Sequence, residues 1–224
     1  MGYAYSVNDD LSNAQPLTIF GEWECALKLS SADDYSGGVT HGYETLNSIR
    51  FFVDNALVDI GDMTTLTQCH SFSVIENSNL YDHDGTSIFA EHGSKHIWSI
   101  DGLVIKQSIN WKMSVNLGYC YLAMHLPLKA YTDRMSIDSK IGVSNVSFGL
   151  FDNTKSLDIF GETSGLFTHF EVGEYPKLAN GGSLLIADNG GNPYNKCYYV
   201  ITSGASVSNG DLWKSETLYK FDKK

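Results

Sequence analysis

Charged side chains are scarce in this sequence, and basic ones are the scarcer kind. Charged residues make up 18% of the 224 residues, with 15 Lys and Arg against 26 Asp and Glu, a formal net charge of −11. An acidic chain repels a phosphate backbone and an anionic membrane, so we predict no nucleic-acid partner and no membrane partner. A strongly anionic polysaccharide is disfavoured too, unless Arg50, Lys106 and Lys112 concentrate positive charge in one groove.

Cysteine is also rare, and the usual metal-binding patterns are missing. The four cysteines are widely spaced, and none belongs to a C-x-x-C pair of the kind found in zinc and redox sites. Three of them lie in strand-like stretches, where a free thiol serves as a small buried apolar group. The acidic clusters at 33–34 and 82–84 lack the ligand order of an EF-hand loop, so we predict no metal and no cofactor. The cysteines are Cys25, Cys69, Cys120 and Cys197.

Long apolar runs are missing as well. No stretch approaches the roughly 18 continuous apolar residues of a membrane-spanning helix, and the first sixteen residues have neither the basic nor the apolar region of a signal peptide. An excised domain or a phage structural protein would begin in the same way. The plentiful Gly, Ser, Thr, Asn and Tyr are typical of extracellular or virion proteins, so we predict an extracellular or virion-surface location.

Helical periodicity is absent, and period-two alternation takes its place. In the stretch 22–29, Trp23, Cys25, Leu27 and Leu29 alternate with residues suited to solvent, as in a strand with one buried face. Similar stretches follow, separated by turns rich in Gly, Asn and Asp. They cover residues 49–53, 57–60, 66–75, 87–92, 96–101, 103–111, 117–126, 143–150, 166–172, 183–187, 197–202 and 212–221.

This pattern predicts the fold class. About a dozen short strands without helices indicate an all-β, two-sheet antiparallel β-sandwich or jelly roll with little helix. No repeat of fixed period is present, which disfavours a propeller or a solenoid. We predict an N-terminal arm or lead-in over residues 1–15 and a single sandwich domain over residues 16–224.

A glycine-rich loop before the first hairpin is the first candidate for chemistry. Residues 35–44 read YSGGVTHGYE, which brings His41, Tyr43 and Glu44 within four positions. Glycine permits close backbone approach, and an imidazole beside a carboxylate can transfer protons, so His41 and Glu44 are candidate acid/base residues. The alternative is a tight turn in which these side chains are solvated or cap the backbone.

An aromatic strand face is the second candidate. By alternation, Tyr119, Tyr121, Ala123 and His125 share one face of the 117–126 strand, opposite an apolar face. Aromatic rings stack on the C–H faces of sugars while polar groups take the hydroxyls, so a concave sheet with this lining would suit an oligosaccharide. Trp98 and Trp111 would belong to the same surface. Alternatively, the tyrosines stabilise a half-exposed sheet by cross-strand contacts.

With these features, the chain resembles concanavalin A-like (jelly-roll) lectin and glucanase domains, which occur in glycan-active bacterial proteins and in phage tail fibres or tailspikes. The resemblance is architectural and rests on the strand number, the loop at 37–44, the F-x-V-D hairpin and the strand Y-x-Y-L-A-M. Alginate-lyase-like members of that group carry a Q-[IV]-H motif, to which Gln68-Cys69-His70 is similar. The other two lyase motifs, R-x-E-x-R and Y-F-K-x-G-x-Y-x-Q, are not matched.

The resemblance implies roles for a lyase reaction. His70 or His41 would remove the proton α to a uronate carboxylate, Tyr119 or Tyr121 would act as the acid, and Arg50 or Gln68 would neutralise the carboxylate. The incomplete motifs lead us to rank recognition above cleavage. Three hypotheses remain: a domain that binds a surface or extracellular polysaccharide or oligosaccharide, a polysaccharide lyase in the same groove, and a structural sandwich that forms homo-oligomers. The candidate site residues are His41, Glu44, His70, Tyr119 and Tyr121 for catalysis and Arg50, Gln68, Trp98, Trp111 and His125 for substrate binding.

Overall fold

The computed structural model describes residues 5–6, 15–16, 25–37, 43–65, 67–82, 84–137, 140–143, 149–152, 154–176, 182–187, 191–201 and 204–223. Over these residues the chain is nearly all β, with no α-helix and one 3-10 turn, η1 (Ile60–Asp62). Most strands belong to an antiparallel sheet of ten strands and an antiparallel sheet of four. The predicted two-sheet antiparallel sandwich is confirmed. No helix among the described residues is long and apolar enough to cross a membrane.

The strands have the following bounds: β1 (Tyr5–Ser6), β2 (Gln15–Pro16), β3 (Glu44–Val53), β4 (Ala56–Val58), β5 (Ser71–Tyr81), β6 (Ile88–Ser99), β7 (Gly102–Trp111), β8 (Val115–Asn116), β9 (Cys120–His125), β10 (Arg134–Ile137), β11 (Lys140–Val143), β12 (Gly149–Asp152), β13 (Ser156–Phe160), β14 (Leu166–Glu174), β15 (Gly182–Ala187), β16 (Lys196–Ile201), β17 (Ser206–Val207) and β18 (Leu212–Lys223).

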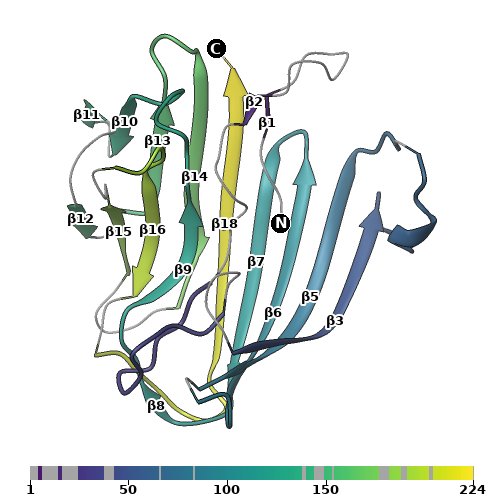
Figure 1. Cartoon of the computed structure of the whole chain (residues 1–224), viewed down its shortest axis with the longest axis vertical. Coiled ribbons are helices and arrows are strands. Elements are labelled where there is room, and N and C mark those ends of the chain that lie inside the picture. The colour runs from purple at the N-terminus through teal and green to yellow at the C-terminus, as the bar shows by residue number, and fades with distance from the viewer. Residues whose placement is uncertain are drawn as a thin grey trace.

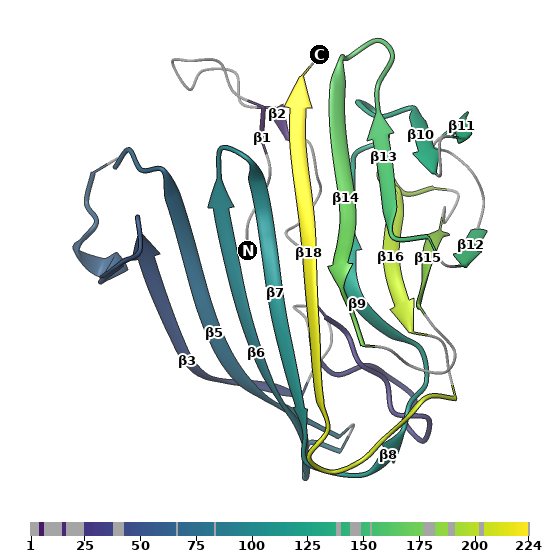
Figure 2. The ribbon, with the colours of Figure 1, turned by 180° about the vertical axis from the view of Figure 1, so that it is seen from behind.

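The two sheets overlap over only part of the larger one. The large sheet has the order β11-β10-β13-β14-β18-β7-β6-β5-β3-β4, and the small sheet has the order β12-β15-β16-β9. Figures 1 and 2 show the small sheet against the half of the large sheet that contains β10, β13 and β14, while β6, β5 and β3 extend beyond it. We call the face of the large sheet that packs against the small sheet the inner face, and the opposite face the outer face.

Alternation along the central strands explains the core. In β7, the side chains of Leu103, Ile105 and Ile109 are buried on the inner face, and the residues between them are more exposed. β18 repeats this pattern with Trp213 and Tyr219. Because a strand sends successive side chains to opposite faces, one apolar set from each strand suffices to build the core against β9 and β16.

The hairpin of β3 and β4 follows the sequence prediction. Asp54 and Asn55 form its two-residue turn, and both have positive φ, 47° and 67°. Asn and Asp tolerate this left-handed conformation better than most residues, which is why this dipeptide favours a tight hairpin. The turn returns the chain so that β4 pairs with the last residues of β3 only.

An extra residue in β9 changes which of its side chains share a face. The pairing of β9 with β16 skips Leu122, which is therefore a β-bulge. Both Leu122 and Ala123 pack into the core, whereas Tyr121 lies in a separate outer cluster. His125 is completely buried. The expectation that Tyr119, Tyr121, Ala123 and His125 share one open face is therefore wrong, because a bulge shifts the alternation by one residue.

The cysteines are free thiols, as the sequence indicated. Cys25, Cys120 and Cys197 are buried and Cys69 is exposed. Burial raises the pKa of the Cys120 thiol to about 12, because the thiolate loses its hydration in the core. The buried cysteines therefore act as small apolar groups of the core.

Candidate functional site

Polar and titratable side chains gather on the inner face where the small sheet does not cover it. Strand pairing places Ser78 of β5 opposite His92 of β6, and Glu76 opposite Ser94. Val74 lies opposite His96, one step further along the same face. Glu44, at the start of β3, reaches the same region through its carboxylate. We call this set the site cluster: Glu44, Glu76, Ser78, His92, Ser94 and His96.

Glu44 and His92 form the centre of the site cluster. The Nδ1 atom of His92 lies 3.4 Å from Oε1 of Glu44, and the hydroxyl of Ser78 donates a short hydrogen bond to the same oxygen. The side chains of His92 and Glu44 are 12% and 25% exposed, respectively. A carboxylate that contacts one ring nitrogen fixes the orientation of an imidazole and supports its use in proton transfer.

The second ring nitrogen of His92 is unpaired within the described part of the chain. Its Nε2 atom is buried and has no hydrogen-bond partner among the described residues. Ser78 does not contact Nε2, because its hydroxyl donates to Glu44 instead. The group is therefore not a serine-nucleophile triad, in which the imidazole must accept the proton of the nucleophile. It is a carboxylate–imidazole pair whose second nitrogen is buried and has no partner in the part of the chain that the structure describes.

A second carboxylate lies one step along the sheet. The hydroxyl of Ser94 donates to Oε2 of Glu76 over 3.2 Å, and both residues sit on neighbouring strands at the same level. The exposed apolar side chain of Ile49 is opposite Glu76 on β3. Two carboxylates and an imidazole thus face the same open part of the sheet, which gives it a strong hydrogen-bonding capacity for hydroxyl groups.

Aromatic rings continue this surface beyond His96. The ring of His96 lies 5.7 Å from that of Trp98, and the ring of Phe72 lies 5.6 Å from Trp98 on the other side. Phe51 follows Phe72 at 6.4 Å. Burial, with a smaller effect from His92, lowers the pKa of His96 to about 4, so its imidazole is neutral at pH 7. The site cluster therefore borders an apolar aromatic row on one side.

Tyr43 holds the entry to β3 in an unusual conformation. Its φ is 71°, in the left-handed region that is uncommon for a bulky side chain. A side chain at Gly85 would lie 3.1 Å from the Tyr43 ring, so this glycine leaves room for the ring. Such strain is concentrated at functional positions, and here it directly precedes Glu44.

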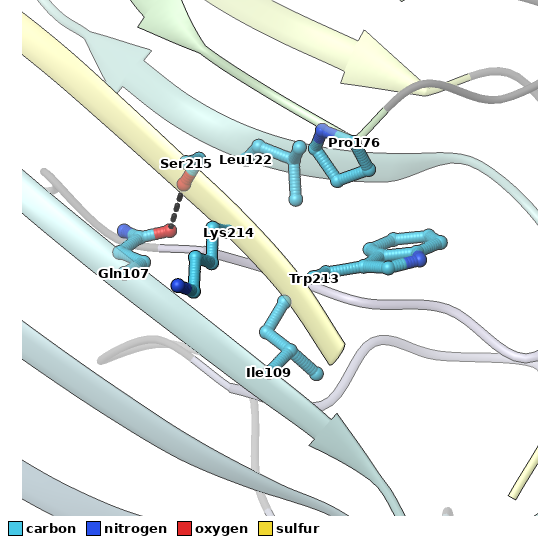
Figure 3. A pocket seen from close by; sticks show the side chains of 7 residues that line it. All are labelled: Gln107, Ile109, Leu122, Pro176, Trp213, Lys214 and Ser215. Carbon is cyan, nitrogen blue, oxygen red and sulfur yellow. Dashed lines mark hydrogen bonds between the residues drawn. The ribbon is translucent and has the colours of Figure 1, made fainter. Parts of the chain in front are cut away.

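A small hollow lies where the site cluster meets the small sheet. It is lined by Gln107, Ile109, Leu122, Pro176 and Trp213, with Lys214 and Ser215, and has an empty volume of about 140 Å³ that includes open solvent. Figure 3 shows the Ser215 hydroxyl pointing at Oε1 of Gln107, to which it donates over 3.3 Å. The hollow has no room for a water-sized sphere, so it is a gap in the packing at the edge of the core and not a ligand pocket.

Two of the predicted site residues lie in or beside this region. Glu44 is a member of the site cluster, and Trp98 belongs to the aromatic row. The two residues lie at opposite ends of this region, because Glu44 is level with Ala90 of β6, whereas Trp98 is level with Phe72 at the other end of β5. His41 lies outside the described residues.

The lyase-like residues are not brought together. Arg50 lies on the outer face of β3, since its pairing partner Ile75 is also an outer-face residue. Gln68 and His70 are exposed in the segment that precedes β5, where the backbone N–H of His70 donates to Asp54. The His70 side chain is fully exposed and 3.6 Å from the carboxylate of Asp54.

The remaining predicted residues are spread over the small sheet and the core. Tyr119 is 46% exposed just before β9, and Tyr121 stacks on Tyr35 outside the sandwich with a centroid distance of 5.3 Å. Trp111 is completely buried against Phe89 and Trp213. His125 is also completely buried, and its Nε2 lies 2.9 Å from the Thr168 hydroxyl. Neither Trp111 nor His125 reaches a ligand at the surface.

Sequence reasoning missed His92, His96 and Glu76 as members of one site. A signal was present, because His92, Ser94, His96 and Trp98 alternate along one strand and therefore share a face. Within the described parts of the chain, no group of three or more His, Cys, Asp or Glu side chains is arranged to hold a metal ion.

Comparisons with known proteins show the fold. No family model and no curated protein matches the sequence. A galactose mutarotase-like protein from Clostridium acetobutylicum superposes with a TM-score of 0.51 and 11% identity, covering 89% of this chain and 79% of that one. The GH36 α-galactosidase AgaB from Geobacillus stearothermophilus superposes with a TM-score of 0.51 and 10% identity, and the match covers 98% of this chain but 31% of the enzyme. The chain is thus similar in fold to these β-sandwich proteins, and the likenesses do not support the expected concanavalin A-like relationship.

Proposed function

We propose that the chain binds carbohydrate on the open part of the inner face. The observation that carries this proposal is the Glu44–His92 pair with Glu76 next to it on the same face. A sugar ring offers hydroxyls to the carboxylates and the imidazole. The aromatic row of Phe72 and Trp98 lies roughly 20 Å further along the sheet, where it would take the C–H face of another ring of an oligosaccharide. The similar structures are a galactose mutarotase-like protein and an α-galactosidase, which supports the same class of ligand.

The charge of this face favours a neutral sugar. Over β3, β5, β6 and β7, the described inner-face residues include Glu44 and Glu76 but no Lys or Arg. An anionic sugar would meet two carboxylates there without a cation to compensate. A lyase also needs a group that neutralises the uronate carboxylate, and Arg50 lies on the opposite face of the sheet. Lyase action therefore has no support from this geometry.

A proton-transfer activity is the second candidate, and the free Nε2 of His92 favours it. Interconversion of sugar anomers needs one group that takes the proton of the anomeric hydroxyl and one that protonates the ring oxygen, followed by the reverse steps after rotation. His92 and Glu76 would be these groups, with Glu44 orienting the imidazole of His92.

An extracellular or virion-surface location remains a prediction from composition.

Isothermal titration with neutral mono- and oligosaccharides tests the binding proposal. Glu44→Gln and His92→Asn should each weaken binding at least tenfold, because each removes a hydrogen-bonding group from the sugar or from its neighbour. Arg50→Gln is the matched control, since it changes a charge on the same strand but on the other face. Equal affinity for all four proteins, or no binding by the unaltered chain across the panel, would contradict the proposal.

Polarimetry of freshly dissolved aldoses tests anomer interconversion, which His92→Asn should abolish.

A further inference from the structure

The outer face of the large sheet, opposite the site cluster, has a separated charge pattern. Lys95 lies directly opposite Lys106 across β6 and β7, and Arg50 and Lys95 flank Ile75 from the two sides of β5. Among the described residues, neither Arg50 nor Lys95 has an ion-pair partner. Like charges directly opposite each other destabilise a sheet. Lys106 is compensated by Glu216, so Arg50 and Lys95 are the basic groups that an acidic surface of a second copy could compensate.

The acidic counterpart lies on the other half of the same face. Glu174 of β14 is directly opposite Glu216 of β18, and Glu171 and Asp158 follow on β14 and β13. The half formed by β3, β5, β6 and β7 carries Arg50, Lys95, Lys106 and Lys112 against Glu91, which pairs with Lys112. The half formed by β13, β14 and β18 carries Asp158, Glu171, Glu174, Glu216 and Asp222 against Lys214, Lys220 and His169, whose ring nitrogens lie 2.6 Å from Asp158 and 3.3 Å from Glu171. One ion pair, Lys106 with Glu216 at 2.7 Å, joins the two halves.

An apolar row crosses this face near the turn between β6 and β7. Strand pairing places Leu218, Val104 and Ile97 side by side, and Ser73 of β5 separates Ile97 from Phe52, with Leu57 of β4 at the end of the row. Leu57 is 66% exposed, and the other four apolar side chains are partly exposed. A row of this kind, with charges on both sides, is typical of a protein–protein interface with a less polar centre.

From this pattern we infer that two copies of the chain associate through their outer faces, with the basic half of each copy against the acidic half of the other. The two-fold axis of this dimer runs parallel to β7 and β18 and lies between the large sheets of the two copies. It stacks Val104 of one copy on Leu218 of the other near the centre of the contact. The same operation places β3, β5 and β6 of one copy over β13 and β14 of the second, so each dimer contains the basic–acidic contact twice.

The size of the surface is sufficient for such a contact. The six strands from β3 to β14 are adjacent in the sheet. At about 4.8 Å between strands and about 33 Å for a ten-residue strand, they present roughly 900 Å² before twist. A stable interface needs about 800 Å² per partner, so this face alone reaches the usual size. The site cluster is on the opposite face and stays accessible in the dimer.

Charge reversal with rescue tests the inference, with mass measured by light scattering after size exclusion at 50 mM and 500 mM salt. The unaltered chain should be dimeric at 50 mM salt and shift toward monomer at 500 mM, because screening weakens charge contacts. Arg50→Glu with Lys95→Glu should give a monomer, and so should Glu171→Lys with Glu174→Lys. An equimolar mixture of these two variants should restore a dimer, because each altered half then meets a complementary one. Lys28→Glu with Lys129→Glu, away from this face, is the matched control.

Several results would overturn the inference. A monomer at 200 µM in 50 mM salt would do so, as would a dimer that persists in both double variants or a mixture that stays monomeric although circular dichroism shows both variants folded. Retention of the monomeric chain on an anionic polymer column, lost with Arg50→Glu and Lys95→Glu, would assign the basic half to an anionic ligand instead. Leu218→Lys, at the end of the apolar row that lies near the two-fold axis, should also abolish the dimer, which links the association to this face.

Discussion

Lowering the pH from 7 to 5 perturbs two imidazoles that the fold holds away from water. Burial lowers the pKa of His125 to about 3, with a smaller effect from His169, and lowers the pKa of His96 to about 4. In the unfolded chain both groups return to about 6.5. Between these values the unfolded state binds more protons than the folded state, so the stability that is present above pH 6.5 is lost as the pH falls.

The expected loss follows from the linkage relation. At pH 5, a histidine with an unfolded pKa of about 6.5 and a much lower folded pKa costs about 2 kcal/mol of folding free energy relative to neutral pH. His96 and His125 together therefore remove about 4 kcal/mol, a large part of the 5–15 kcal/mol of a typical domain. His125 should make the larger contribution of the two, because it is completely buried between Thr168 and the Phe170 ring.

Urea unfolding at pH 7 and pH 5 measures this loss. His125→Asn should reduce the difference between the free energies of unfolding at pH 7 and pH 5 by about 2 kcal/mol, and His96→Asn should do the same. This difference is independent of how much either substitution lowers the free energy of unfolding at pH 7. His70→Asn is the control, because its side chain is fully exposed. A pH dependence unchanged in both variants, or NMR titration of either imidazole near pH 6.5 in the folded protein, would refute the reasoning.

Two further substitutions test the packing. Gly102→Ala should destabilise the fold by about 3 kcal/mol or more, because φ is +122° and a Cβ there would lie 2.2 Å from the carbonyl oxygen of Tyr219; a thermal melt within a degree of the unaltered chain would contradict this close approach. Asn195→Leu should raise the free energy of unfolding by about 1 kcal/mol, because the Asn195 amide is buried with no hydrogen-bond partner among the described residues and a leucine has a similar branched shape. A lower free energy of unfolding in urea would show that the amide has a partner in solution.

Alternation in the sequence is sufficient to predict strands that keep a strict period of two. The stretches 103–111 and 212–221 correspond to β7 and β18 with the expected buried sets. Alternation fails as a guide where a strand passes through a glycine or contains a β-bulge. The predicted strands 87–92 and 96–101 are one strand, β6, which passes through Gly93. A Cβ at Gly93 would lie 2.9 Å from the Ser108 hydroxyl, so the glycine is there for close packing between strands and does not mark a turn. The bulge at Leu122 has no composition signal, so the inward turn of His125 could not be predicted from the sequence.

The site depends on register between distant strands more than on any local motif. Glu44 and His92 are separated by 48 positions, and they meet because β5 pairs with both β3 and β6. A bulge in β3 at Asn47, where the pairing with β5 skips one residue, brings Glu44 onto the inner face while Arg50 stays on the outer one. Without that extra residue the two side chains would share the outer face, and Glu44 would be lost from the site cluster. The separation of an acidic inner site from a basic outer patch therefore depends on one residue of register, which no single-strand pattern reveals.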